Sequence, residues 1–217
     1  MKRSMGRYLL VLSIPMVFAV WSSPAKAADI SEITADDYYG AIYYQRALEH
    51  PQVSRQKSAR SRLRMVARDI RWKPKRLAAA IRKVEELSGD PIDLARRAVE
   101  GALEASRVQG RVRDVLVNSD EPKHVVMYIR WQGTRGKNAV KEASEIASVV
   151  ASQAPLVSTL SLACTHPKSP ADSKTPVWSA KIGRRAMSRI SRSRIDDYAD
   201  RMYKGLFEIE DDKSQSF

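Results

Sequence analysis

The chain has 217 residues, of which 43% are hydrophobic and 29% are charged, and its formal net charge is +13. This balance is that of an ordinary globular protein, and it excludes collagen-like and wholly disordered classes. The only cysteine, Cys164, cannot form an internal disulfide, so a hydrophobic core alone must hold the fold. Because Cys164 ends the apolar run 160–164, we expect it to be a buried structural thiol.

The first 27 residues have the three parts of a secretory signal peptide. A basic start precedes an uncharged apolar stretch at 8–21 and a small-residue segment that ends in an A-x-A sequence at 25–27. The pattern predicts cleavage after Ala27 and export to the periplasm or the extracellular space. An uncleaved anchor is the alternative, but 14 apolar residues interrupted by a proline are short for a bilayer core of about 30 Å. The mature chain is expected to lack a transmembrane segment.

Residues 28–110 have the periodicity and the end signals of helices. Thr34 followed by Asp36 and Asp37 is typical of a helix start, and Pro74 ends a helix before it. The sequence Ser-Gly-Asp-Pro at 88–91 closes one helix and opens the next. We expect about four antiparallel helices, at roughly 34–49, 54–72, 75–87 and 91–108.

After Gly110 the hydrophobic period changes to two, which is the period of strands. In the clearest strand the residues of one face alternate with those of the other: Val125, Met127, Ile129 and Trp131 with Val126, Tyr128 and Arg130. We expect strands at 112–117, 125–131, 156–164 and 177–183 and helices at 138–153 and 195–206. This ββαββα order predicts an α+β fold in which residues 111–207 form a two-layer module with a four-stranded sheet. Residues 208–217 are expected to form a flexible polar tail.

Basic residues concentrate in two segments. Loss of residues 1–27, which hold four basic residues and no acidic one, leaves 34 basic and 25 acidic residues, a net charge of +9. Segment 54–76 alone has ten basic residues and one acidic residue, and it is also +9. On a helix, its arginines at steps of 4, 4 and 3 form one stripe: Arg60, Arg64, Arg68 and Arg71. The second segment, 181–194, has no acidic residue and contains Lys181, Arg184, Arg185, Arg189, Arg192 and Arg194.

An arginine stripe is suited to carboxylates and phosphates, which accept paired hydrogen bonds from guanidinium groups. The expected partner is therefore an acidic protein or an anionic lipid or glycan of the envelope, and export argues against a nucleic acid. The alternative is a solvated face paired within the fold, since residues 28–50 carry a net charge of −4. The expected anion- or partner-binding residues are Arg60, Arg64, Arg68, Arg71, Lys75, Arg185, Arg189 and Arg192.

Four tyrosines within seven residues of the first expected helix form a candidate aromatic partner surface: Tyr38, Tyr39, Tyr43 and Tyr44. Packing of these rings between the first helix and the rest of the protein is the alternative. No motif indicates catalysis, a metal or a cofactor, because no two of the three histidines have ligand spacing. Segment 133–138 joins a strand to a helix but lacks the spacing of a phosphate-binding loop, so we expect a plain turn.

The sequence thus predicts an exported, non-enzymatic binding protein that docks through an arginine-rich helix on an anionic envelope component or an acidic protein. The alternative is an assembly subunit that self-associates into homo-oligomers through a sheet edge of its α+β module. A third hypothesis is a small enzyme whose site the sequence does not reveal. It would be favoured if three carboxylates met a histidine in one pocket, namely Asp196, Asp197 and Asp200 with His124 or His166.

Overall fold

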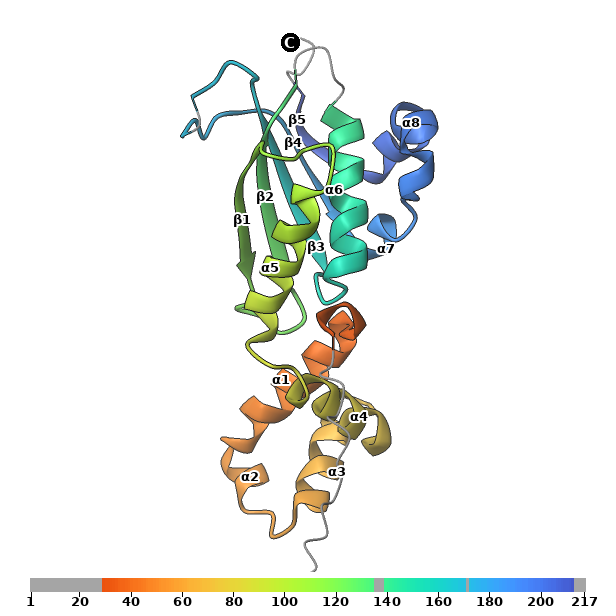
Figure 1. Ribbon diagram of the computed structural model, residues 1–217. Helices are drawn as coiled ribbons and strands as arrows, with labels where there is room; N and C mark the ends of the chain where they lie inside the picture. The colour runs from red at the N-terminus through yellow and green to blue at the C-terminus, as the bar shows by residue number, and fades with distance from the viewer. Residues whose placement is uncertain (1–28, 135–138, 171, 213–217) are drawn as a thin grey trace, which may run out of the picture.

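The computed structural model describes residues 29–134, 139–170 and 172–212. Three helices and two short helical turns form a helical part, and the rest of the described chain forms a sheet with helices against it (Figure 1). The expected signal peptide, most of the turn at 133–138 and the end of the tail lie outside the described residues. No helix in the described ranges is long and apolar enough to cross a membrane.

The helical part contains η1 (Ile30–Glu32), α1 (Ala35–Leu48), α2 (Pro51–Ser54), α3 (Ala59–Asp69) and α4 (Pro74–Glu85). The expected start of the first helix is confirmed. The hydroxyl of Thr34 accepts the backbone N–H of Asp37 at 3.1 Å, and the Asp37 carboxylate accepts the backbone N–H of Thr34 at 3.2 Å. This reciprocal cap satisfies two N–H groups that would otherwise lack partners at the helix end.

The prediction of a single helix over 54–72 is wrong. The chain breaks after α2, and the Ser58 hydroxyl starts α3 by accepting the backbone N–H of Ser61 at 3.1 Å. At the other end, Arg71 has a φ of +57°, the left-handed region that ends a right-handed helix. A serine that caps in this way is a local signal, and it overrides the helical spacing of the flanking residues.

Trp72 holds α1 against α4. A Cβ atom at Gly40 of α1 would lie 2.5 Å from Cζ3 of the Trp72 ring, so only glycine allows this close approach. On α4, the Arg76 guanidinium stacks 3.9 Å from the centroid of the same ring. Ion pairs join the two helices beside it: Asp36 with Arg76 at 2.5 Å, and Asp37 with Lys83 at 3.0 Å. A small core lies beneath, made by Val53, Val66, Ala67 and Leu77.

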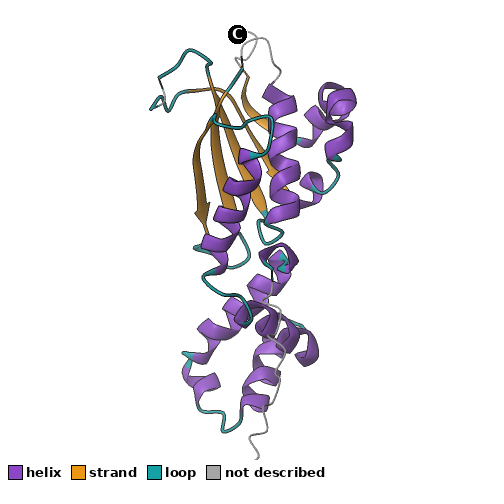
Figure 2. Ribbon diagram, in the orientation of Figure 1, coloured by secondary structure: helices purple, strands orange, loops and turns teal. Residues whose placement is uncertain are grey.

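The sheet has five strands in the order β1 (Val112–Asn118), β2 (Val126–Gln132), β3 (Thr159–Thr165), β4 (Pro176–Gly183) and β5 (Glu208–Asp212). β2 and β3 are parallel, and the other neighbours are antiparallel. Helix α6 (Ala139–Gln153) crosses over between β2 and β3, and α5 (Pro91–Glu104) lies beside it on the same face (Figures 1 and 2). The expected α+β class is confirmed. The fourth expected helix, α5, packs against α6 and β1 of the sheet part.

The expectation of four strands is wrong, because the polar segment at Glu208 begins a fifth. β5 pairs antiparallel with β4, where Ile209 lies opposite Ala180, and Glu210 forms an ion pair with Lys181 at 2.6 Å. With one apolar residue among five, the segment has no strand pattern of its own. Its pairing comes from the edge that β4 offers.

The helix expected over 195–206 is also different. It is divided into α8 (Ile195–Tyr198), a π-helical turn (Ala199–Tyr203) and a 3-10 turn (Lys204–Leu206). Together with α7 (Arg184–Met187), these pieces pack beside α6. Met202, in the π-helical turn, is 60% exposed.

The main core lies between the sheet and the helices α5 and α6. Trp131 of β2 and Trp178 of β4 meet edge to face with centroids 6.0 Å apart, and Cys164 lies between them in register. The expected burial of Cys164 is confirmed, and this burial raises the pKa of its thiol to about 12. The opposite face of the sheet carries no helix of the described chain (Figure 2), and Leu116 on that face is 60% exposed.

The close approach of Trp72 to Gly40 gives a stability prediction. We expect Gly40→Ala to destabilise the protein by about 1–2 kcal/mol, because the overpacking exceeds the gain in helix propensity. Gly101→Ala is the matched control on α5, since nothing lies within 4 Å of the added methyl group. It should stabilise by about 0.5–1 kcal/mol. Urea unfolding of both variants measures the difference, and equal effects would contradict the packing described.

Candidate functional site

The exposed arginines of α3 lack acidic partners in the described part of the chain. Arg60, Arg64 and Arg68, which we call the arginine face, point away from the buried side of α3 at Val66 and Ala67. Nearby carboxylates are engaged elsewhere, in the α1–α4 ion pairs and in a hydrogen bond between Tyr43 and Asp69. Pairing with residues 28–50 thus involves Arg76 of the basic segment, through Asp36, and no ion pair is found for the arginine face among the described residues.

The remaining expected anion-binding residues do not all extend the arginine face. Arg71 lies beyond the end of α3, in the left-handed turn, and Lys75 lies in the first turn of α4; both are exposed. Arg192 is used inside the fold, in an ion pair with Glu145 at 3.1 Å. Arg185 and Arg189 are exposed, but they lie beside α6, away from α3 at the far end of the helical part (Figure 1). The two basic segments are separate surfaces.

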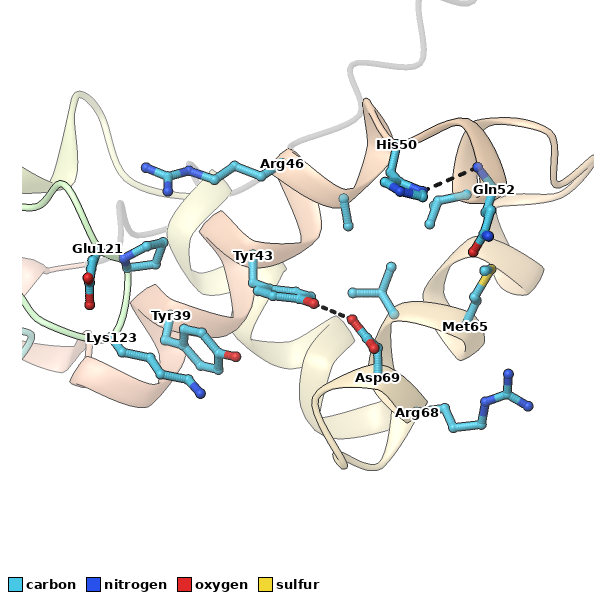
Figure 3. Close-up of a pocket in the computed structure, with 14 residues that line it drawn as sticks. Tyr39, Tyr43, Arg46, His50, Gln52, Met65, Arg68, Asp69, Glu121 and Lys123 are labelled. Carbon is cyan, nitrogen blue, oxygen red and sulfur yellow. Dashed lines mark hydrogen bonds between the residues drawn. The ribbon is translucent and has the colours of Figure 1, made fainter.

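A pocket of about 800 Å³ opens beside the arginine face, between α1, α2, α3 and the loop that joins β1 to β2 (Figure 3). Its floor is apolar and consists of Ala47, Val53, Met65 and Val66. Its rim is polar or aromatic and includes Tyr39, Tyr43, Arg46, His50, Gln52, Arg68, Asp69, Glu121 and Lys123. The pocket thus brings one arginine of the face together with two of the four tyrosines.

The other two tyrosines do not form a partner surface. Tyr38 is only 5% exposed in the main core, and this burial raises the pKa of its phenol. Tyr44 is half-buried against the small core. The expected aromatic surface is therefore wrong for Tyr38, whereas Tyr39 and Tyr43 share one helix face and reach the pocket.

Hydrogen bonds and charge set the character of the pocket. The Tyr43 hydroxyl donates to the Asp69 carboxylate, which, with burial and the charge of Asp69, raises the pKa of Tyr43 to about 12. The Lys123 ammonium lies 5.0 Å from the centroid of the Tyr39 ring. Arg46 donates to the backbone carbonyl of Asp120 at 3.4 Å and holds the loop close to α1. With Arg46, Arg68 and Lys123 against Asp69 and Glu121, the rim has a net positive charge.

Two buried carboxylates of α6, Glu142 and Glu145, form a polar cluster in the core that no sequence pattern indicated. The carboxylate of Glu142 accepts the Trp131 indole N–H at 2.8 Å and the Thr134 hydroxyl at 3.1 Å, and it pairs with Arg111 at 2.7 Å. Glu145 pairs with Arg107 at 3.3 Å as well as with Arg192. Both side chains are only 4% exposed. Their buried charge is compensated by arginines, which is typical of a structural network.

A meeting of Asp196, Asp197 and Asp200 with a histidine, which would favour an enzyme, is not found among the described residues. Asp196 receives two hydrogen bonds from Arg107, at 2.5 and 2.6 Å, which lower the pKa of its carboxyl group. The histidine at the pocket is His50, whose Nδ1 accepts the backbone N–H of Gln52. Within the same described ranges, no group of three or more His, Cys, Asp and Glu side chains is arranged to hold a metal ion.

Comparison of the chain with protein-family models, curated proteins and solved structures gives no match. The arginine face and the pocket beside it form the candidate functional site.

The bond between Tyr43 and Asp69 predicts an unusual tyrosine titration. We expect Tyr43 to ionise near pH 12, and Asp69→Ala to bring its pKa back toward 10. Because the folded protein keeps this proton after the unfolded chain has lost it, the free energy of unfolding should fall between about pH 10 and pH 12 and be unaffected below. NMR of tyrosine ring carbons measures the pKa. Asp93→Asn is the control and should leave it unchanged.

The buried network on α6 predicts a large effect of one arginine. We expect Arg111→Ala to destabilise the protein by about 3–5 kcal/mol, because Glu142 loses its charged partner in a buried site. Arg97→Ala, at an exposed position of α5, should change stability by less than about 0.5 kcal/mol. Adding Glu142→Gln to Arg111→Ala should recover part of the loss. Similar unfolding curves for the two single variants would show that the network does not support the fold.

Proposed function

We propose that the protein is an exported, non-enzymatic binding protein that docks on an acidic partner through the arginine face of α3. The observation that carries the proposal is the exposed row Arg60, Arg64 and Arg68, which has no acidic partner in the described chain. The row spans about 12 Å at 1.5 Å per residue. Uncompensated like charges repel one another, and an anionic partner relieves that repulsion.

The chemistry of the row favours carboxylates and phosphates. Each guanidinium group offers a planar pair of donors, which matches the two oxygens of such groups. Arg71 and Lys75 add cations beyond the end of α3. The partner classes that fit are an acidic protein and an anionic lipid or glycan, and long-range attraction to the basic chain would speed their encounter.

Export and the absence of catalysis are parts of the same proposal. The signal-peptide pattern at residues 1–27 supports export. The groups that most resemble catalytic ones are engaged otherwise: the Cys164 thiol is buried with a raised pKa, and the carboxylates of Glu142 and Glu145 are held by arginines. The proposed binding role uses the exposed arginines of α3 instead.

One observation favours a second candidate, an assembly subunit that self-associates. β1 is an edge strand of the sheet, and Leu116 on the uncovered sheet face is 60% exposed. Edge strands present unpaired backbone groups that can pair with another copy. A mass that depends on concentration distinguishes this candidate from a monomeric docking protein.

Charge reversal tests the docking proposal. We expect Arg60→Glu/Arg64→Glu to weaken binding to polyglutamate, to an acidic polysaccharide or to anionic vesicles by roughly tenfold or more, which is about 1.4 kcal/mol. Wild-type binding should also weaken as salt is raised.

Arg97→Glu/Arg201→Glu is the matched control. Both side chains are exposed and lie off α3, and the net charge changes by the same amount. Binding is measured by biolayer interferometry at several salt concentrations. Equal loss in the two double variants would mean that net charge alone attracts the probe, and the arginine face would have no specific role.

A further inference from the structure

We infer that the pocket beside the arginine face binds an extended acidic segment of a partner protein, with one apolar side chain of that segment on the pocket floor. The inference rests on the proposed function, and it adds the class of partner and the place where specificity resides. It is carried by the composition of the pocket, which combines an apolar floor with cations at both ends.

The apolar floor of the pocket does not favour a ligand that binds through charge alone. Ala47 of α1, Val53 of α2 and Val66 of α3 close it with apolar groups, so contact with it is favourable only for an apolar group. The volume of about 800 Å³ lies in the range of sites that bind small molecules and short peptide segments. An apolar side chain with a few residues of chain on either side fits such a space.

The rim supplies the charge that an acidic segment needs. Figure 3 shows Arg46 and Lys123 toward one end of the pocket and Arg68 toward the other. The three cations face two carboxylates at the rim, Asp69 and Glu121, so the rim keeps a net positive charge. Cations on both sides of an apolar floor match a chain in which acidic residues flank one apolar residue. Arg64, one turn from Arg68, continues the cationic path outside the pocket.

The tyrosines argue against a glycan as the occupant. A sugar ring stacks on an exposed aromatic face, but Lys123 lies over the ring of Tyr39. Tyr39 also meets the edge of Trp72, with centroids 6.1 Å apart, and Tyr43, with centroids 5.7 Å apart. These rings act as walls of the pocket. A polypeptide, which brings an apolar side chain and carboxylates together, uses every part of the site.

The test uses two synthetic peptides of roughly ten residues, a length that spans such a site when extended. Both are rich in Glu and Ser; one has a central leucine, and the other has glycine there. We expect the leucine peptide to bind the mature protein about tenfold more tightly, as measured by isothermal titration calorimetry. Ala47→Phe, which fills the floor, should remove this difference between the two peptides.

Two further variants make the test independent of folding defects. Met65→Gln places a polar group on the floor without filling it, and it should reduce the preference for leucine. Arg60→Glu/Arg64→Glu lies outside the pocket and should weaken both peptides equally, so that their ratio is preserved. Circular dichroism and thermal melts confirm that each variant is folded.

Each contrary result has a distinct meaning. Equal affinities of the two peptides, with binding that falls as salt rises, would overturn the pocket inference and leave the docking proposal standing. Tighter binding of an acidic polysaccharide or of anionic vesicles, lost in Ala47→Phe, would assign the pocket to that class and overturn the inference. No binding of any of these anionic probes would overturn the inference and the docking proposal together.

Discussion

Two buried carboxylates on α6 hold the sheet part of this protein together. Glu142 and Glu145 receive donors from the end of β2, from the segment between α5 and β1, and from the turn before α8. Removing two carboxylates from water is costly, and only the complete set of partners offsets it. The position of α6 therefore determines where three segments that are distant in the sequence must lie.

The basic residues of the chain differ in whether they pair with the buried carboxylates of α6. Arg107, Arg111 and Arg192 form ion pairs with the carboxylates of α6. The arginine face of α3 has no such task in the described chain. Composition and net charge could not separate the two kinds, because a basic segment looks the same whether its partner lies within the fold or outside it. Of the segment 181–194, Arg192 belongs to this network, whereas Arg185 and Arg189 are exposed like the arginines of α3.

The parts of the fold that the sequence predicted are those with local causes. The cap at Thr34, the turn before Pro91 and the alternation in β2 each arise from neighbouring residues, and the structure has all three. The break before α3 also has a local cause, the Ser58 cap, but the errors in strand number and burial arise from contacts between distant residues. β5 exists because β4 offers an edge, and Tyr38 is buried because the sheet part packs against α1. Glu142 and Glu145 look like solvent-exposed helix residues until their arginine partners are located.

For the same reason, the sequence could predict one wall of the pocket and not the other. Tyr39 and Tyr43 are one turn apart on α1, which the spacing of the tyrosines indicates. The opposite wall comes from the loop between β1 and β2, held by contacts of Arg46 with Asp120 and of Lys123 with Tyr39. The site thus lies at the junction of the helical part and the sheet part. A ligand that contacts both walls favours the arrangement in which they meet, so its binding energy also stabilises the junction.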